Sequence, residues 1–298
     1  MKILIIIVTY NAMRWAEHCF NSLRNSTITP DVYVVDNGST DGTQAFIQKQ
    51  YPEVMFHQSG ENLGFGKANN LGLQYALDND YDYVYLLNQD AWVMPDTFEK
   101  LIDVSVRHSE YGILSPFQMN ADLYHVDRNF VADVCAWESN PNILNDLYNQ
   151  NVSEVYAVRT VMAAHWFMPI STVRTIGGFS PSFPHYGEDD NYLKRVRYRR
   201  LKIGIVPFLR VVHDRGWRER SIEQILYLGF IECINCLSSP QCPFFKAVCL
   251  VWYITLSYTI KYKSLIPISY PFRTLCRLKK ILNNRRKSIT EIGAFLNI

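Results

Sequence analysis

The sequence predicts an α/β fold with a mostly parallel central sheet, followed by a C-terminal helical region. Through the first half of the chain, short apolar runs alternate with amphipathic stretches of helical length. This alternation is typical of parallel strands whose sheet is covered by helices on both faces. From Ser221 onward the chain contains helical segments rich in Leu, Ile, Tyr and Phe, without this alternation.

Four strands and four helices are expected in order. The strands are "KILIIIVTY" at 2–10, "DVYVVD" at 31–36, "VMFHQS" at 54–59 and the apolar start of "YVYLLNQDAW" at 83–87. β-Branched, aromatic and aliphatic residues dominate these runs, as in the middle of a sheet. The helices follow at 13–24, 41–50 and 67–78, and the fourth begins at Pro95, a residue favoured in the first helical turn.

Composition indicates an ordered globular protein with an uneven charge distribution. The chain has 298 residues, of which 48% are hydrophobic and 19% charged, enough to bury one large core. From Pro240 to the end it carries nine more basic than acidic residues, whereas the first 239 carry seven more acidic than basic ones. A basic tail on an acidic body predicts contact with an anionic surface, either a membrane or a nucleic acid.

The cysteines and the first residues indicate a cytoplasmic protein. Seven scattered cysteines are an odd number, and Cys233-x-x-Cys236 has no second pair or nearby histidines to complete a zinc site. The opening apolar run, Ile3 to Val8, is shorter than the core of a signal peptide. We therefore expect reduced thiols in the cytoplasm.

Polar residues follow the expected strands at the edge where α/β sheets bind ligands. In such sheets the ligand lies outside the carboxyl ends of the strands. The strand ends carry Thr9, Tyr10, Asn11, Asp36, Asn37, Asn62, Asn69, Asn88, Gln89 and Asp90.

Two of these strand ends contain glycine-rich loops. "DNGSTDGT" is an ordinary turn and helix cap in most of its residues, but Asp36 lies at the strand end, where it could accept hydrogen bonds from a base or ribose. "GFGKAN" has Gly64 and Gly66 but Asn69 in place of the third glycine of a dinucleotide fingerprint, and it follows the third strand. Dehydrogenase chemistry is therefore disfavoured, although the loop could still bind a phosphate or a sugar.

Asp90 and His213 each end an apolar run and form a candidate metal site. Strand-end aspartates are common and a lone histidine is usually structural, so neither residue alone is strong evidence. A carboxylate and an imidazole that share a cation with substrate phosphates would suit Mn²⁺ or Mg²⁺. Arg215, two residues after His213, could neutralise phosphate charge.

Three consecutive acids, Glu188 to Asp190, precede a helix that continues to about Arg200. Acidic residues at a helix N-terminus favour the helix dipole, which accounts for one or two of them. Three exceed what a cap needs, so one of them is a candidate catalytic base. "GGF" at 177–179 is either a helix C-cap or a point where backbone approaches a sugar.

Together these motifs resemble family-2 glycosyltransferases of the GT-A type, in particular the bacterial rhamnosyltransferase-like group that builds surface polysaccharides. The resemblance rests on "VTYN", "VDNGSTDGT", "ENLGFGKANNLG", "LLNQD", "GGF", "GEDDNYLKR" and His213, and it covers about residues 1–216. It implies a nucleotide-sugar donor and inversion at the anomeric carbon.

The resemblance also implies roles for individual residues. Asp189 would be the catalytic base, and Asp90 with His213 would hold Mn²⁺ or Mg²⁺. The residues on the acceptor side would be Gly178, Phe179, Glu188 and Asp190. The residues that bind the donor or its nucleotide would be Thr9, Tyr10, Asn11, Asp36, Asn62, Gly64, Asn69 and Arg215.

The chain departs from the family pattern at two positions. Family members often carry D-x-D on the metal strand, where this chain has Asn88-Gln89-Asp90, so metal affinity would depend on the diphosphate and His213. The acidic motif often has another acid at the position of Asn191.

We therefore expect a GT-A catalytic domain over residues 1–220 and a basic helical region over 221–298. The helix at 247–260 is either a buried core helix or an interfacial one that lies with the tail against anionic lipid on the cytoplasmic face of the inner membrane. The expected partners are a nucleotide-sugar donor and a glycan or lipid-linked acceptor, with no nucleic acid.

Two other functions stay open at this point. A nucleotidyltransferase that forms a nucleotide sugar would share the fold, but it normally needs an early glycine- and Arg/Lys-rich loop, and "VTYNAMRW" contains no glycine. A non-catalytic module that binds nucleotide sugars or glycans would tolerate loss of the acidic residues at 188–190, which are intact here.

Overall fold

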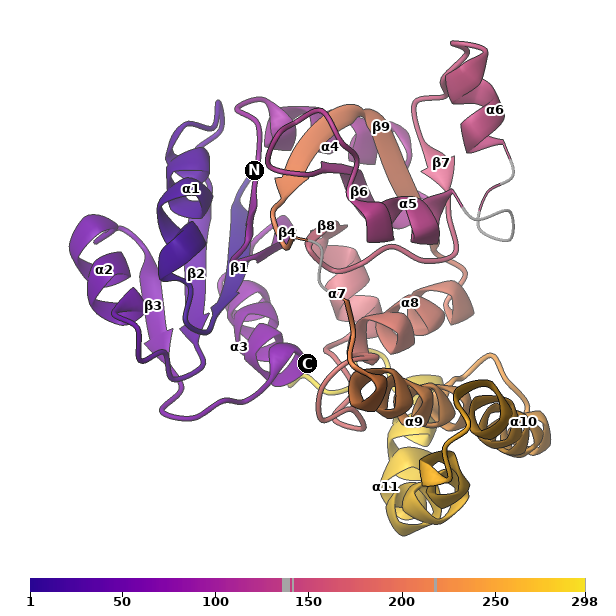
Figure 1. Cartoon of the computed structure of the whole chain (residues 1–298). Helices are drawn as coiled ribbons and strands as arrows, with labels where there is room; N and C mark the ends of the chain where they lie inside the picture. The colour runs from indigo at the N-terminus through magenta and orange to yellow at the C-terminus, as the bar shows by residue number, and fades with distance from the viewer. Residues whose placement is uncertain (136–139, 141, 217–218, 298) are drawn as a thin grey trace.

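The structure, a computed structural model, describes residues 1–135, 140, 142–216 and 219–297, and within them one nine-stranded sheet forms the centre of the molecule (Figure 1). The strand order is β3-β2-β1-β4-β8-β6-β9-β5, and β7 pairs with β9. The strands are β1 (Ile3–Thr9), β2 (Asp31–Asp36), β3 (Met55–Gln58), β4 (Tyr83–Asn88), β5 (Ala91–Trp92), β6 (Tyr111–Met119), β7 (Tyr156–Ala157), β8 (His165–Pro169) and β9 (Lys202–His213).

The expected α/β architecture is confirmed. β3, β2, β1 and β4 run parallel, as do β6 and β9, and β8 runs antiparallel between the two parallel groups. Because β8 reverses direction, its first residue, His165, lies beside Leu87 at the carboxyl end of β4. The short strand β5 was not expected, and it pairs Ala91 with His213.

The helices begin close to the positions expected from the sequence. Expected starts at residues 41, 67 and 95 correspond to observed starts at Thr43, Phe65 and Thr97, shifts of two residues that are common at helix ends. The helices are α1 (Met13–Arg24), α2 (Thr43–Gln50), α3 (Phe65–Asp78), α4 (Thr97–Arg107), α5 (Arg128–Val134), α6 (Ile143–Tyr148), α7 (Ile170–Ile176), α8 (Glu188–Tyr198), α9 (Ile222–Ser238), α10 (Phe244–Tyr262), the 3₁₀ helix η1 (Ile266–Ser269) and α11 (Tyr270–Thr290).

Alternating side chains of β1 divide the core between the two faces of the sheet. Ile5 and Ile7 pack with apolar residues of α1, α2 and α4, whereas Leu4 and Ile6 pack with those of α3, α7 and α8. Successive side chains of a strand point to opposite faces, so a continuous apolar run indicates a strand covered on both sides. Because helices cover both faces of the sheet, a ligand site can form in the loops at the carboxyl ends of the strands.

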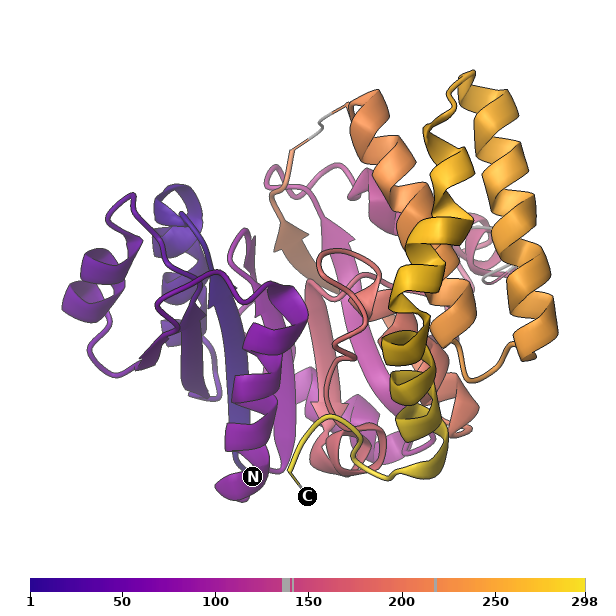
Figure 2. The same ribbon diagram turned by 90° about the horizontal axis from the view of Figure 1, so that it is seen from below.

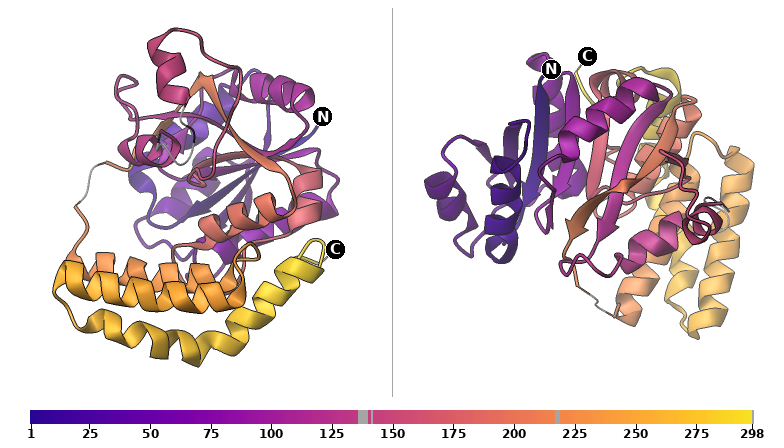
Figure 3. Two further views of the ribbon diagram at one scale, coloured as in Figure 1. Left: turned by 90° about the vertical axis from the view of Figure 1, so that its right-hand side faces the viewer. Right: turned by 90° about the horizontal axis from the view of Figure 1, so that it is seen from above.

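Three C-terminal helices form a separate layer beside α8 (Figure 3). α9, α10 and α11 share their own apolar cluster, which includes Phe230, Val251 and Tyr270. After α11 the chain returns to α3, where the Asn297 N–H donates to Gln74 Oε1 at 2.7 Å. The proposed boundary at residue 220 stays a prediction.

The helix expected over 247–260 is only half-buried. α10 packs Ala247, Val251 and Ile254 against the layer, while Trp252 and Tyr253 on its other side are exposed. One side of α10 is therefore part of a core, and contact of its other side with lipid stays a prediction. Within the described part of the chain, none of the helices combines the length and the apolar character that a membrane crossing requires.

Candidate active site

The predicted ligand-binding edge is built around Asp36 at the end of β2. Asp36 is fully buried beside Thr9, whose Oγ1 donates to the carboxylate at 2.8 Å. The carboxylate also accepts from Ser39 Oγ at 2.6 Å, Gln44 Nε2 at 2.7 Å and the N–H groups of Gly38 and Ser39. Asp36 and Thr9 thus shape the loop after β2, and their direct contact with a nucleotide stays a prediction.

Tyr10 and Asn11 extend this edge toward solvent. The backbone of Tyr10 is clamped by Gln89, whose Oε1 accepts from the Tyr10 N–H at 2.7 Å and whose Nε2 donates to the Tyr10 carbonyl at 3.2 Å. Asn11 has a positive φ of 53°, and its Oδ1 accepts the Thr40 N–H at 2.9 Å. Tyr10 is 48% exposed, so its ring can pack on a ligand at the edge.

The loop before α3 is fixed by its own side chains. Asn62 Oδ1 accepts the Gly64 N–H at 2.9 Å, and Gly64 has a φ of 77°, which favours glycine. Asn69 is buried, and its Nδ2 donates to the Phe65 carbonyl at 2.9 Å. Gly64 and Asn62 therefore lie on the loop as predicted, whereas Asn69 lies inside the first turns of α3.

The loop before α3 packs directly against the loop before α8. A Cβ at Gly64 would lie 3.3 Å from the Pro184 carbonyl oxygen, and one at Gly66 would lie 3.0 Å from the Cβ of Phe179 and 3.6 Å from that of Glu188. Only glycine allows this approach without displacing its neighbours. Two motifs that lie more than a hundred residues apart in the sequence are thus brought together.

Asp90 and His213, the predicted metal ligands, lie together. Their Oδ1 and Nε2 atoms are 3.6 Å apart, and His213 Nδ1 lies 3.2 Å from Gln118 Oε1 at the end of β6. Burial alone would raise the pKa of Asp90, but the hydrogen bond and charge of His213 outweigh it and lower that pKa. Asp90 is therefore ionised at neutral pH.

This pair fits a divalent cation whose other ligands come from substrate and water. No group of three or more His, Cys, Asp or Glu side chains that could hold a metal is found among the residues the structure describes. Mg²⁺ sites that act on phosphates commonly use one or two protein ligands and complete their shell with phosphate oxygens and water. Gln118 would orient the imidazole from its far side, as outer groups do at metal sites.

Arg215 follows the metal pair and is held by Asp127. Its Nε and Nη2 donate to the two Asp127 oxygens at 3.0 and 2.7 Å, and Asp127 also caps α5 by accepting the Phe130 N–H. The charge of Arg215 contributes to the lowered pKa of Asp90 and partly offsets the raised pKa of Asp133, so it lies within electrostatic reach of both. Its predicted contact with the donor phosphates stays a prediction.

The three acids at the start of α8 are in very different surroundings. Glu188 is only 6% exposed, and its Oε2 has no hydrogen-bond partner; burial and then the charge of Asp189 raise the pKa of Glu188 to about 7. Burial and then the charge of Asp190 raise the pKa of Asp189 to about 7. Asp190 itself is exposed. A carboxylate with a pKa near neutrality is suited to general base catalysis.

Asp133 on α5 adds a fourth carboxylate to this group. Its pKa is raised to about 6, by burial and then by the charge of Asp190, while Arg215 acts in the opposite direction. The charge of Asp133 in turn contributes to the raised pKa of Asp189. Asp133 and Arg215 therefore connect the acids of α8 electrostatically to the metal pair.

Helix α9 braces the start of α8. Gly187 has a φ of 84°, and a Cβ there would lie 2.6 Å from Ile231 and 2.8 Å from Asn235. Asn235 Nδ2 donates to the Gly187 carbonyl at 3.3 Å, and Asn191 Nδ2 donates to Ser238 Oγ at 3.1 Å. Asn191, which replaces the further acid of the family pattern, thus attaches α8 to α9.

The "GGF" segment packs against protein on all sides. Gly177 has a φ of 82° and ends α7, which is the C-cap alternative, and the Gly178 N–H donates to the Ala294 carbonyl at 2.9 Å. A Cβ at Gly178 would lie 2.5 Å from Asn70, and Phe179 is buried in the core. Contact of Gly178 or Phe179 with an acceptor stays a prediction.

Several residues of the site were not predicted from the sequence. Gln118 is a buried polar residue in an apolar strand, and Asp127 stands three residues before Phe130 as helix caps do. Either pattern could have marked its residue as a candidate for the site. Asp133 and Asn235 lie on helices far from the motifs, and only the fold brings them to the site.

Comparison with known proteins places the chain among glycosyltransferases. The family model described as "Glycosyl transferase family 2" matches residues 4–159. The chain is 23% identical over 260 residues to the low-salt glycan biosynthesis hexosyltransferase Agl10 of Haloferax volcanii, covering 86% of this chain and 81% of that protein. It is 32% identical over 127 residues to an N-acetylglucosaminyl-diphospho-decaprenol L-rhamnosyltransferase of Mycobacterium tuberculosis, covering 40% of this chain and 41% of that one.

Solved structures share the fold. A crystal structure of residues 1–349 of S. aureus TarS with UDP matches with a TM-score of 0.55 at 16% identity, covering 98% of this chain and 82% of that one. The mannosyltransferase PcManGT of Pyrobaculum calidifontis, in complex with GDP-Man and Mn²⁺, matches with a TM-score of 0.56 at 14% identity, covering 97% and 87%. The GT-A type of fold that the motifs implied is confirmed.

Proposed function

This chain belongs to glycosyl transferase family 2, and we propose that it moves a sugar with inversion from a nucleotide-sugar donor to a hydroxyl of a glycan or lipid-linked acceptor. Glycosyl transfer in polysaccharide biosynthesis is the activity that the family and its relatives support. The donor class, the stereochemistry, the need for metal and the roles of single residues are the proposal.

The observation that carries the proposal is the meeting of the donor loop with the acids of α8. Gly66 at the start of α3 lies against Glu188, so a sugar held by the loop would lie beside the carboxylates. Burial raises the pKa of Asp189 to about 7, while part of the residue stays exposed to solvent. Such a carboxylate can accept a proton from a hydroxyl at neutral pH.

In the proposed reaction Asp189 takes the proton of the acceptor hydroxyl while that oxygen attacks the anomeric carbon and the bond to the nucleoside diphosphate breaks. This reaction places the base and the leaving group on opposite sides of the sugar, so one displacement would invert the centre. Asp90 and His213 would hold Mn²⁺ or Mg²⁺, which when bound supplies positive charge to the diphosphate. Arg215, with its charge close to Asp90, would supplement that charge.

On the donor side, Tyr10 and Asn11 present the exposed part of the strand edge, and Asp36 with Thr9 sets the shape of the loop behind them. We assign the nucleoside to this edge and the sugar to the loop of Asn62 and Gly64. UDP-GlcNAc and GDP-Man are bound by structural neighbours, which supports a nucleotide sugar in kind.

On the acceptor side, the mycobacterial relative's name describes a sugar on a lipid diphosphate as its acceptor. By analogy we propose a lipid-linked acceptor for this chain, with Glu188 and Asp190 beside it. The seven cysteines are free thiols in the structure, which suits a place in the cytoplasm, at the inner membrane face. We retain residues 1–220 as the catalytic domain and 221–298 as the region that meets the membrane.

The test is a screen of purified protein against UDP-, GDP- and dTDP-sugars with a lipid diphosphate sugar as acceptor. Release of nucleoside diphosphate by the wild type, but not by Asp189→Asn, is expected for one donor. Asp103→Asn, an exposed carboxylate on α4, is the matched control and should keep full activity. Release at the level of Asp189→Asn for every donor would contradict the proposal, and pyrophosphate release from a nucleoside triphosphate and a sugar phosphate would favour a nucleotidyltransferase.

A further inference from the structure

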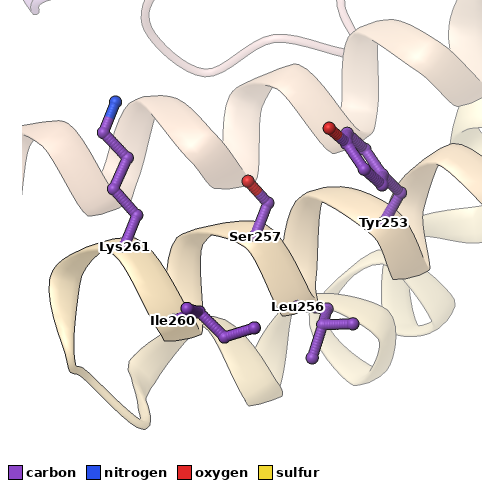
Figure 4. Close-up of a pocket in the computed structure, with 5 residues that line it drawn as sticks. All are labelled: Tyr253, Leu256, Ser257, Ile260 and Lys261. Carbon is purple, nitrogen blue, oxygen red and sulfur yellow. The ribbon is translucent and has the colours of Figure 1, made fainter.

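The outer side of α10 presents an apolar surface that none of the helices of the layer covers. Figure 4 shows Tyr253, Ser257 and Lys261 along one line of the helix and Leu256 and Ile260 along the next. Leu256 is 61% and Ile260 67% exposed. Isolated exposed leucines are normal on a protein surface, but a row of them indicates a surface that another phase or molecule contacts.

The row continues through η1 into the first turns of α11. Leu265, Ile266, Phe272 and Leu275 are between 52% and 78% exposed. We define the helix apex as the set Leu256, Ile260, Leu265, Ile266, Phe272 and Leu275, which surrounds the turn between α10 and α11. These side chains are held outward because their helices use the opposite sides, with Val251 and Tyr270, to pack on α9.

The surroundings of the helix apex are basic. Lys261, Lys263, Lys279 and Lys280 are exposed, and residues 240–290 contain no Asp or Glu. Three arginines of α11 contact residues of α9, although Arg277 itself is exposed. Arg273 and Arg277 lie over the Phe230 ring at 3.8 and 5.5 Å, and Arg285 donates to the Leu237 carbonyl at 3.2 Å. The four lysines are therefore placed to meet an external anionic surface, together with the exposed Arg277, Arg286 and Lys287.

The helix apex lies at the same end of the molecule as the active site. In Figure 2 the arrowhead of β9 and the turn between α10 and α11 both lie at the upper end, while both chain termini lie at the lower end. His213 and Asp90 mark the carboxyl end of β9. A surface that contacts the helix apex would therefore lie on the side of the strand ends that hold the candidate active site.

We propose that the helix apex inserts into the interface of an anionic phospholipid bilayer while the surrounding lysines contact its head groups. Exposed Leu, Ile and Phe beside lysines are the pattern of interfacial helices, which combine apolar burial with attraction to anionic lipid. A second copy docked apex to apex would bring the lysines together, and like charges disfavour that arrangement. The inference deepens the proposed function, on which it rests for the lipid-linked acceptor, by placing the active site at the membrane.

The experiment measures co-sedimentation of the full chain with vesicles, without donor or acceptor. The wild type should bind phosphatidylcholine vesicles that contain phosphatidylglycerol and should bind pure phosphatidylcholine much less. Replacing Leu256, Ile260, Phe272 and Leu275 with Ser should lower binding by at least about tenfold, because the apolar anchors are lost. The matched control replaces Val106, Tyr124, Leu144 and Tyr148, which are exposed elsewhere, with Ser and should bind like the wild type.

A salt series distinguishes the electrostatic contribution to vesicle binding from the apolar one. Changing the four lysines to Gln should weaken the preference for anionic vesicles. High salt should weaken wild-type binding without abolishing it, because insertion persists. A wild type that binds neither vesicle, or serine variants that bind as well as the wild type, would overturn the proposal. A wild-type dimer that the apex serines convert to a monomer, with no vesicle binding, would assign the surface to a second copy instead. Activity on a water-soluble acceptor tests the proposed function separately.

Discussion

Asp36 and Asp189 are the same residue type at the same edge of the molecule, in opposite situations. Asp36 accepts hydrogen bonds from three side chains and two backbone N–H groups. Asp189 accepts one from its neighbour, the Asp190 N–H at 2.9 Å, and burial followed by the charge of Asp190 raises its pKa to about 7. A carboxylate whose oxygens accept a full set of hydrogen bonds holds a loop in place. A carboxylate with few hydrogen-bond donors around it is left able to exchange a proton.

The difference arises from the elements that present the two residues. Asp36 ends a parallel strand, where the following turn points its N–H groups back at the carboxylate. Asp189 lies in the first turn of α8, between Glu188 and Asp190. The helix N-terminus stabilises negative charge there, but burial and like charge oppose it. Four predictions probe this contrast, in order of expected effect.

Asp189→Asn should lower turnover by roughly 10²–10⁴-fold, the usual scale for a lost general base, while donor binding stays nearly intact. Steady-state kinetics and donor titration measure the two effects. Asp103→Asn, an exposed carboxylate on α4 outside the site, is the matched control and should keep full activity. If Asp189→Asn turns over like the wild type while Glu188→Gln or Asp190→Asn is inactive, the base has been assigned to the wrong acid.

Asp90→Ala should lower turnover on the order of 10²-fold, because the lost ligand weakens charge stabilisation on the diphosphate. A chelator should stop transfer by the wild type, and added Mn²⁺ or Mg²⁺ should restore it, whereas the variant should respond little to added metal. Full wild-type activity in excess chelator would remove metal from the mechanism.

Asp36→Asn should reduce the free energy of unfolding by about 2–3 kcal/mol, because an amide presents one acceptor oxygen to several donors. Chemical denaturation measures the change, with Asp103→Asn on the exposed side of α4 as control. A variant as stable as the wild type would show that the network around Asp36 contributes little to the loop.

Glu188→Gln should raise the melting temperature at about pH 8 by a few degrees and change it little at about pH 4. The pKa of Glu188 is raised from its ordinary value of 4.5 to about 7 in the folded protein. The wild type therefore loses stability as the pH rises from 4.5 through 7, because the carboxylate must then ionise while buried. The variant has no such charge to bury. A gain at low pH instead would contradict the assignment of a raised pKa.

Much of the fold could be predicted from the sequence, because its signals are local. The run from Ile3 to Thr9 is apolar without a break, as a strand buried on both faces requires, and the helices that cover it begin within two residues of the expected positions. β5 was missed because two residues, Ala91 and Trp92, are too few to show alternation. Its partner His213 lies more than a hundred residues away, and only the fold reveals that pairing.

The candidate site was predictable where a motif carries its own chemistry. The pair Asp90 and His213 was named from two strand ends, and the structure brings them within 3.6 Å. Asp133 could not be named, since one acid on a short helix looks like any surface residue. The role of Gly187 was also hidden, because its cause is the side chain of Asn235 on another helix.

The pH dependence of kcat/KM tests the central claim most directly. That claim is that Asp189, a carboxylate with few hydrogen-bond donors at the start of α8, is the base. Because Asp189 must be deprotonated to act, the rate should rise about tenfold per pH unit at low pH and level off above an apparent pKa of about 7. Glu188→Gln should keep this rising limb and Asp189→Asn should lose it. A rate that is independent of pH from about 5.5 to 8.5 in the folded wild type, or a limb that persists in Asp189→Asn, would contradict the account.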